Sequence, residues 1–543
     1  MKSPEEFSRD VYRKASAKRA QRKRLLTLVL ALPVAAAGVL AVRFGAPLLQ
    51  GSKSGAAMST DYREESITED AMEGNGRYTL EAAPARLMDV SWRAWEARRE
   101  ALYEEAWKDV TGNEDKETLA KLQQGLDEQL ARLDEEQKTF REQAAELGLS
   151  PEQNLLDPAF GKSVTALGSK MAPLLLSGEE NGCISPTSLY LALALLGQGA
   201  QGQTRQEMLS LLGTEDADWL ADQCGKFIRQ SYAENDVHTL MIENSLWAAD
   251  RLTFAPDYLK TASEDFYTSL FRADFTDPGV GSAVSQWISE HTKGLLQPQL
   301  QFDPRTVLAL VNTLYFYEEW HDEFNAENNT VEDFTLPDGK TMQTTYMHQA
   351  DSQMVYFGEK FTLAALSLKG SDRMIFVLPD EGVDAGELLE DAQLAAVLAG
   401  EKEGEFLYRQ VEWSVPRFCL DGSYDLREAL KALGMEDAFD AEKADFSGLG
   451  SAPEGPLYVS QARQDVHIGI DEQGVEAAAF TMFAMEAGGA MPPDETVEMK
   501  LDRPFLFAVA ANTAVAPTAA EEYPAPVDTL LFYGVCAQPE EAE

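Results

Sequence analysis

An uncharged apolar run of 18 residues, 25–42, constrains this chain most, because a run of that length is just long enough to cross a bilayer. Seven Lys or Arg residues precede it between positions 13 and 24. Basic residues beside a span stay cytoplasmic, so the sequence predicts a cytoplasmic segment over residues 1–24, a transmembrane helix over 25–43 and an extracellular body. A cleaved signal peptide, which would make the body secreted, is the alternative. The long basic lead and Arg43 directly after the run favour a retained anchor.

The charge of the chain is divided unevenly. Residues 1–43 hold ten Lys or Arg and three Asp or Glu, a net of +7, while the 543-residue chain carries −45, which leaves −52 for the remainder. Nucleic acid and other polyanions would be repelled by so acidic a body. The sequence therefore predicts no nucleic-acid partner. An apolar fraction of 44% is enough for a large buried core.

Two segments separate the apolar run from the body. Residues 44–85 are rich in Gly, Ser, Glu and Asp, which predicts a flexible linker. Residues 86–150 contain few Gly or Pro, and five leucines recur at spacings of three and four (Leu119, Leu122, Leu126, Leu130 and Leu133). This pattern indicates a charged helical stalk, most simply two helices broken near residues 111–113. A spacer and a partner-binding hairpin are both consistent with it.

Residues that carry catalytic or metal chemistry are sparse. The four cysteines, Cys183, Cys224, Cys419 and Cys536, show no metal-ligand spacing and are expected to be small buried residues, with one disulfide left possible. None of the five histidines lies in an HExxH motif or beside a Gly-x-Ser-x-Gly elbow. We therefore expect no enzyme activity, no cofactor, no catalytic residue and no metal site.

From about residue 151 the pattern alternates between helical and strand-like segments. Residues 413–418 and 374–378 have the composition of strands, and residues 425–433 form an amphipathic pattern that ends at Gly434. By pattern alone, residues 151–543 form one mixed α/β or α+β domain.

Seven short motifs in this domain, taken in order, carry a resemblance to the serpins, a family of protease inhibitors. They begin with Ser185-Pro186 and Ser188, which are similar to the start of the serpin helix B, and include Asn312, similar to the central strand 3 of the family's sheet A. The motifs lie at residues 181–204, 287–294, 311–324, 376–381, 423–439, 502–507 and 531–534. The resemblance covers about residues 155–540. It implies an α+β serpin fold with a large central sheet A, two smaller sheets, surrounding helices and an exposed reactive-centre loop.

The segment that resembles the hinge of the reactive-centre loop is residues 470–481. Local composition favours a helix over residues 475–485, but the resemblance implies that this segment must be able to become a strand. The hinge residues are Glu472, Gly474, Val475, Glu476, Ala477, Ala478, Ala479 and Thr481. Because a strand alternates faces, Val475, Ala477, Ala479 and Thr481 share one small, uncharged face, and Glu476 lies on the other. Gly474 is expected to give the pivot its backbone freedom.

The family's spacing implies a scissile bond at Gly488, followed by Gly489. Met485, Ala487 and Met491 are alternatives, because glycine is a poor anchor for a specificity pocket and residues 492–498 are longer than usual for serpins. The window 484–491 contains no Lys or Arg, which favours elastase-like or subtilisin-like target enzymes over trypsin-like ones.

The resemblance also assigns shutter and breach positions around the sheet: Ser185, Ser188, Asn312, Trp320 and Gln464. Gln464 departs from the histidine that many serpins place there. A glutamine can still form a hydrogen bond to Ser185 or Asn312 across the shutter.

Together these features predict a membrane-anchored, bacterial-type, monomeric serpin. It would inhibit serine proteases, with cysteine proteases as a further class of target, and it would act as a suicide substrate. The protease forms an acyl-enzyme with the loop, and insertion of the cleaved loop into sheet A traps it. The alternative is a non-inhibitory protein of the same fold that serves as an extracellular binding or scaffold protein.

Overall fold

The structure, a computed structural model, describes residues 78–85, 87–89, 95, 98–99, 102–103, 105–106, 116–235, 237–400, 406–453, 455–476, 495–517 and 524–540. The predicted cytoplasmic segment 1–24 and transmembrane segment 25–43 lie outside these residues. Among the described helices, none combines the length and the apolarity that crossing a membrane requires. The described residues of 98–134 belong to one compact unit, and those of 67–97 and 135–543 belong to another, which holds all the sheets described below.

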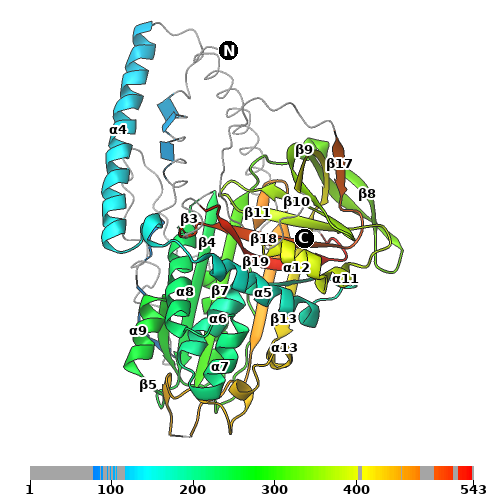
Figure 1. The fold of residues 1–543 in the computed structure, drawn as a ribbon. Coiled ribbons are helices and arrows are strands. Elements are labelled where there is room, and N and C mark those ends of the chain that lie inside the picture. The colour runs from blue at the N-terminus through cyan, green and yellow to red at the C-terminus, as the bar shows by residue number, and fades with distance from the viewer. Residues whose placement is uncertain are drawn as a thin grey trace, which may run out of the picture. The chain divides into compact units, whose positions relative to one another are not determined.

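The longest helix, α4, covers the second half of the predicted stalk, and the others surround the sheets (Figure 1). The α-helices are α4 Lys116–Glu146, α5 Pro158–Leu175, α6 Pro186–Gln198, α7 Gly202–Leu211, α8 Ala217–Ser231, α9 Pro256–Glu264, α10 Val280–His291, α11 Ala385–Leu389, α12 Ala392–Leu398 and α13 Arg427–Ala432. The last of these is shorter than the helix predicted over 425–433, because β13 continues to Asp425 before the chain turns.

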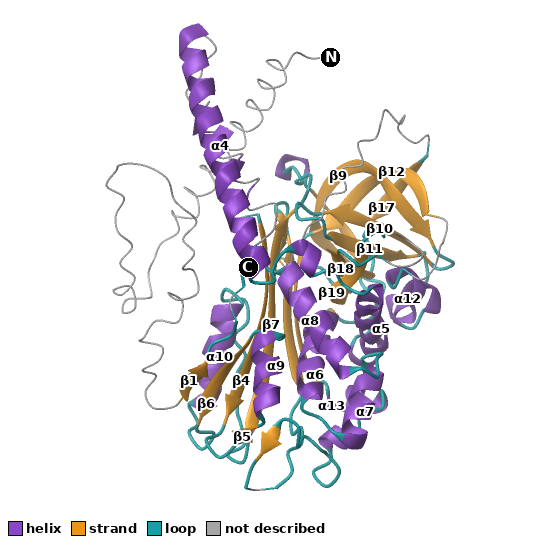
Figure 2. Cartoon of the chain, turned by 60° about the vertical axis from the view of Figure 1, so that its left-hand side comes forward, coloured by secondary structure: helices purple, strands orange, loops and turns teal. Residues whose placement is uncertain are grey.

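An eight-stranded sheet forms the centre of the second unit, in the order β1-β6-β4-β7-β16-β15-β13, with β3 paired to β4. Its strands are β1 Tyr78–Ala82, β3 Ala233–Glu234, β4 His238–Ala248, β6 Thr268–Ala273, β7 Leu308–Glu319, β13 Phe418–Asp425, β15 Arg463–Ile470 and β16 Gly474–Glu476. Helices α6 and α8 cover one face and α10 covers part of the other (Figure 2). Covered on both sides, all eleven residues of β4 are buried.

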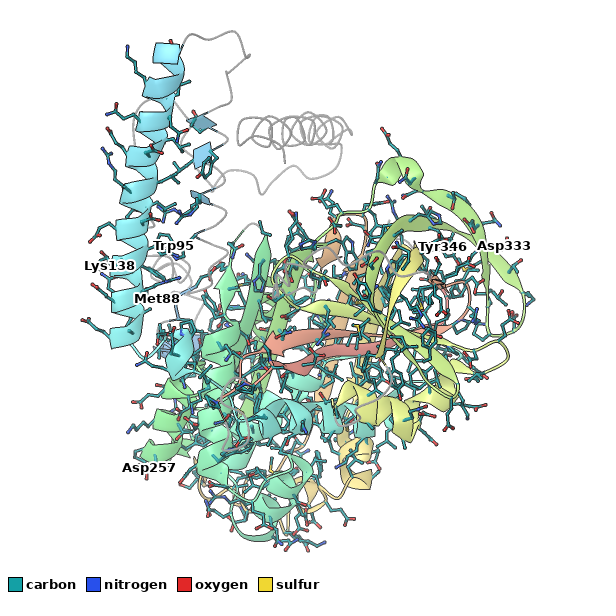
Figure 3. All side chains as sticks on the ribbon, turned by 45° about the horizontal axis from the view of Figure 1, so that its top comes forward. Met88, Trp95, Lys138, Asp257, Asp333 and Tyr346 are labelled. Carbon is teal, nitrogen blue, oxygen red and sulfur yellow. The ribbon has the colours of Figure 1, made fainter. Side chains whose placement is uncertain are left out.

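The second sheet has nine strands, in the order β17-β12-β9-β10-β11-β18-β19-β2, with β8 paired to β9. Its strands are β2 Gly182–Ile184, β8 Thr330–Thr335, β9 Thr341–Phe357, β10 Phe361–Ser367, β11 Arg373–Pro379, β12 Phe406–Pro416, β17 Thr496–Lys500, β18 Phe505–Thr513 and β19 Val527–Cys536. Tyr346 in β9 (Figure 3) is fully buried there, and its hydroxyl donates a hydrogen bond to the Leu501 carbonyl oxygen. A third sheet is the two-stranded pair of β5 Thr253–Phe254 and β14 Gly450–Ser451.

The resemblance implied two smaller sheets beside the large one, whereas the described strands outside sheet A form one nine-stranded sheet and one two-stranded pair. The long strand β9 pairs with β12 along eleven positions and then with β10, so hydrogen bonding is continuous through all nine strands of the second sheet. The predicted strand 374–378 lies within β11. The predicted strand 413–418 is divided at Arg417, so that residues 413–416 end β12 and Phe418 begins β13.

Part of the predicted flexible linker, residues 44–85, is a strand. β1 pairs antiparallel with β6 at the edge of the eight-stranded sheet. Tyr78 packs its ring against Trp247 and Phe271, with ring centroids 5.1 and 6.0 Å apart. Beyond β1, the Asp89 carboxylate accepts a hydrogen bond from the Glu234 backbone N–H at 3.0 Å. The strand was not predicted because polar residues surround it and only two apolar side chains, Tyr78 and Leu80, mark its buried face. Both pack against the apolar cluster beneath α10.

Candidate functional site

The predicted hinge begins at a tight turn between β15 and β16. The Asp471 carboxylate accepts hydrogen bonds from the backbone N–H groups of Gln473 and Gly474, at 2.7 and 3.2 Å, which closes the turn. Trp320, directly after β7, holds the turn from outside. Its backbone N–H donates to the Gln473 carbonyl oxygen at 2.9 Å, and its indole Nε1–H donates to the Asp471 carbonyl oxygen at 2.8 Å. The turn therefore has a fixed position against the end of β7.

Glu472, in the middle of this turn, is anchored by a cation. The Arg417 guanidinium donates to the Glu472 carboxylate through Nε, at 2.8 Å, and through Nη2, while the Asn329 side-chain amide donates to the same oxygen. The Glu472 side chain is only 13% exposed, so both partners matter: hydrogen bonds to a charged group are stronger than those between neutral groups, and they satisfy the carboxylate where water is scarce.

The two residues that follow the turn, Gly474 and Val475, enter the sheet. Gly474 and Val475 pair with Glu319 and Glu318 of β7, and Val475 also pairs with Ile470 of β15. A Cβ on Gly474 would lie 1.9 Å from the Glu318 carbonyl oxygen, so close approach to β7 is what requires glycine here, and not only the freedom expected of a pivot. The Val475 side chain is fully buried on the face that packs toward α6.

Below β16, the space between β7 and β15 is an open cavity of about 590 Å³. Residues 308–316 of β7 form one wall and residues 463–467 of β15 form the other. Ser185, Ser188 and Leu189, at the start of α6, lie at its floor. The cavity therefore follows the line along which β16 would continue if its strand were longer.

The start of α6 holds both walls of this cavity. Ser185 caps the helix with its side chain, and Pro186 occupies the first turn, which fixes where the helix begins. Gln464 of β15 bonds to Ser185 through both amide atoms: its Oε1 accepts from the Ser185 backbone N–H at 3.0 Å, and its Nε2 donates to the Ser185 carbonyl oxygen at 2.9 Å. This is the first of the two bonding possibilities expected for Gln464.

The other wall is held by a separate chain of hydrogen bonds. The Ser188 hydroxyl donates to the Asn312 Oδ1 of β7 at 2.5 Å, and the Asn312 Nδ2 donates to the Asn244 Oδ1 of β4 at 2.8 Å. Among the described residues, the five predicted shutter and breach positions thus lie in two groups, Ser185, Ser188, Asn312 and Gln464 around the cavity floor and Trp320 at the hinge turn.

Several predicted positions cannot be placed. Ala477, Ala478, Ala479, Thr481 and every scissile candidate (Met485, Ala487, Gly488, Gly489 and Met491) lie outside the described residues, and Glu476 is described through its backbone in β16.

Reasoning from the sequence missed three residues that form hydrogen bonds to the predicted site residues. Arg417 and Asn329 lie 55 and 143 residues from Glu472, and Asn244 lies 68 residues from Asn312, so no local pattern marks them. For Arg417, a lone cation within an otherwise uncharged strand-like segment, residues 413–418, was the available signal.

Comparison with known proteins identifies the family. The family model described as serpin (serine protease inhibitor) matches residues 162–520, which is most of the chain, and the chain belongs to the serpin family. Its eight-stranded sheet is the family's sheet A.

Individual relatives are distant but cover the domain well. Serpin-Z1C of Triticum aestivum is 29% identical over 61% of this chain and 86% of its own length. Serpin B10 of Otolemur garnettii is 28% identical over 66% of this chain and 94% of its own length. The native state of tengpin, a thermophilic serpin, superposes with a TM-score of 0.60 at 24% identity, over 70% of this chain and 95% of that one, which supports the fold.

Proposed function

We propose that the chain is an inhibitor of serine proteases that acts as a suicide substrate. The target's nucleophile attacks the loop after Glu476 and forms an acyl-enzyme, and insertion of the cleaved loop between β7 and β15 distorts the enzyme before water hydrolyses the ester. In this mechanism the inhibitor supplies no catalytic group.

One observation carries the proposal: β16 already pairs with both β7 and β15, and a cavity continues between the same two strands. If the loop extends β16 in the same register, Ala477 and Ala479 come alongside Phe316 and Leu314 of β7. Thr481 then reaches Asn312 on one side and Gln464 on the other. Small uncharged residues on this face are suited to burial over α6.

The loop composition supports a class of target. Residues 484–491 carry one charge, Glu486, and no cation, so we infer elastase-like or subtilisin-like serine proteases, with cysteine proteases of similar preference as further targets. The inhibitor would act as a monomer, with the scissile bond at Gly488 or at one of the neighbouring candidates.

The test is to incubate the full chain with an elastase-like and a subtilisin-like protease and to separate the products by denaturing electrophoresis. We expect a covalent adduct that survives denaturation, and mass spectrometry of the released C-terminal peptide locates the cut. Cleavage of the loop without any adduct would favour the non-inhibitory binding or scaffold protein.

We further propose that the protein is a bacterial-type, single-pass membrane serpin, anchored by residues 25–43 with residues 1–24 in the cytoplasm. The basic residues before the apolar run support this orientation. Protease added to intact cells should remove the serpin domain and leave a small protected N-terminal fragment. A body free in the medium that begins after about residue 43 would instead identify a cleaved signal peptide.

A further inference from the structure

Three side chains with complementary chemistry meet on the outer face of sheet A, away from the cavity floor. The Cys419 sulfur of β13 lies 3.7 Å from Nε2 of His467 on β15. On the other side of the ring, the His467 Nδ1 lies 2.8 Å from the Asp421 carboxylate of β13. The order is therefore thiol, imidazole, carboxylate, with the imidazole in the middle.

The register of the two strands produces this arrangement. His467 pairs directly with Asp421, and Cys419 lies two residues earlier on β13, opposite Gly469. Because side chains at every second position share a face, Cys419, Asp421 and His467 lie on the same side. They form a line rather than a ligand set: in the part of the chain that the structure describes, no three His, Cys, Asp or Glu side chains are placed to hold a metal ion.

Gly469 leaves room beside the thiol. A Cβ built on Gly469 would meet none of the described atoms within 4 Å, and the strand neighbour of Gly469 on its other side is Glu476 of β16. Cys419 itself is half-buried, whereas Cys183, Cys224 and Cys536 are buried. Of the four sulfurs, that of Cys419 is therefore the one that an incoming molecule can reach.

The electrostatic surroundings favour a charged imidazole. The hydrogen bond between the ring and the Cys419 sulfur, and then the Asp421 carboxylate, raise the pKa of His467 to about 9, against the opposing effect of burial. The nearest other charges on β15, Arg463 and Asp465, pair with each other at 2.7 Å. A cationic imidazole next to a sulfur stabilises the thiolate, which is the nucleophilic form of cysteine. Burial raises the pKa of the other three thiols, which keeps them protonated.

We propose that Cys419 is a covalent modification site that exchanges with low-molecular-weight disulfides, with the His467 imidazolium as the cation that stabilises the attacking sulfur and Asp421 as the residue that orients the ring. The Cys419 proton passes to water, and the thiolate attacks one sulfur of the disulfide. The disulfide bond breaks, a mixed disulfide forms on Cys419, and the departing thiolate takes up one proton. One disulfide is consumed and one is formed, so no further oxidant is needed.

The test uses the full chain and dipyridyl disulfide, whose released thiopyridone absorbs light, followed under native conditions between pH 5 and 9. One thiol per chain should react rapidly across this range. Cys419→Ser should remove this phase. His467→Gln should slow it at least about tenfold at pH 6, where the wild-type imidazole is charged, and should slow it least near pH 9, where the wild-type imidazole loses its proton. Asp421→Asn should have a smaller effect in the same direction.

The control is His321→Gln, since His321 also bonds to a carboxylate, that of Asp322, but has no bond to a sulfur in the described structure. It should leave the rate unchanged, and thermal melting should show that each variant is folded. A wild-type chain without a fast thiol, a fast phase that survives Cys419→Ser, or a folded His467→Gln variant with the wild-type pH profile would each overturn the proposal. Since none of these measurements involves a protease, they are independent of the proposed inhibition.

Discussion

Adjacent residues at the start of the hinge have opposite requirements. Gly474 must lack a side chain because the Glu318 carbonyl oxygen occupies the space where one would lie, whereas Val475 must have one because it fills a fully buried position. Ala477 and Ala479 share the face of Val475 in an extended chain, so the requirement for small apolar side chains should continue along that face.

The first prediction follows from this alternation. Ala477→Arg or Ala479→Arg would place an unpaired charge on the face that is buried during insertion. If about 2 to 3 kcal/mol of that cost appears in the insertion barrier, insertion slows roughly 30- to 150-fold. The protease should still cut the loop, because the bond is attacked before those residues are buried. Electrophoresis should then show cleaved inhibitor in place of adduct.

Ala478→Arg is the matched control for this prediction, since residue 478 lies on the opposite face beside Glu476. It should form nearly the wild-type amount of adduct. Equal loss at both faces, or full trapping by the Ala477 and Ala479 variants, would mean that the loop does not insert as a strand in this register.

A second prediction concerns His467 and stability. Its pKa in the folded chain is about 9, above the value of about 6.5 in an unfolded chain, so protonation stabilises the fold. The stabilisation is complete below about pH 6.5 and disappears as the pH rises through about 9. We expect His467→Gln to lower the free energy of unfolding by about 1 to 2 kcal/mol at pH 6, after allowance for solvent screening, and to have no such effect near pH 10. Urea unfolding at several pH values measures the difference, and a constant difference would contradict the assignment.

At the scale of elements, β16 is unusual because three residues join two strands that would otherwise be separated by a cavity. Its pairing on both sides fixes the register in which any continuation of the chain would enter. The turn before it is held by Trp320 and by the Arg417–Glu472 ion pair. The position of β16 therefore depends on residues from β7, β12–β13 and the turn together.

Replacement of the two glycines near this hairpin tests the pairing. Gly474→Ala places a methyl group against the backbone of β7, which cannot move aside as a side chain could, and should cost about 1 to 3 kcal/mol. Gly469→Ala, in β15, meets open space and should change stability by less than about 1 kcal/mol. Hydrogen exchange should show faster exchange of the Val475 amide in the first variant only. Equal effects of the two substitutions would argue against the close contact between β16 and β7.

The sequence predicts those features that depend on neighbouring residues, and it does not predict contacts between segments that are distant along the chain. The strand at 374–378 and the first four residues of the one predicted at 413–418 follow from apolar β-branched and aromatic residues, and the start of α6 at Ser185-Pro186 was expected from the family resemblance. The hydrogen bonds of Gln464 and Asn312 depend on which segments become neighbours, and only the family resemblance suggested that. The partners Arg417, Asn329 and Asn244 and the meeting of Cys419 with His467 come from register across strands distant in sequence, which no local pattern encodes.

At the scale of the whole second unit, an N-terminal segment completes the serpin domain. β1 adds a strand beyond β6, and Leu87 and Met88 are buried in the main core. All the serpin-like motifs nevertheless lie after residue 150, so the sequence predicts that residues 151–543 fold and inhibit without this segment. Because β1 packs against the rest of the domain, we expect such a truncation to lower the free energy of unfolding.

The fourth prediction compares two truncated chains, residues 67–543, which keep β1, and residues 151–543, which lack it. Both should form the protease adduct. The shorter chain should be less stable by about 2 to 4 kcal/mol, because it loses the burial of Tyr78, Leu87 and Met88 and exposes the edge of β6. Urea unfolding measures this difference. Complete loss of adduct in the shorter chain would mean that residues 67–150 are required for inhibition. Equal stability of the two chains would contradict a stabilising role for β1.

The pairing of β1 also determines when during synthesis it can form. Residues 78–82 leave the ribosome about 190 residues before their partner strand, 268–273, so at about 5 to 20 residues per second β1 waits on the order of 10 to 40 s without a strand to join. Closing so long a loop also makes this pairing slow relative to local contacts. The nascent chain therefore carries β1 unpaired while β4 and β6 are still being made, and the edge of sheet A is covered only after those strands exist.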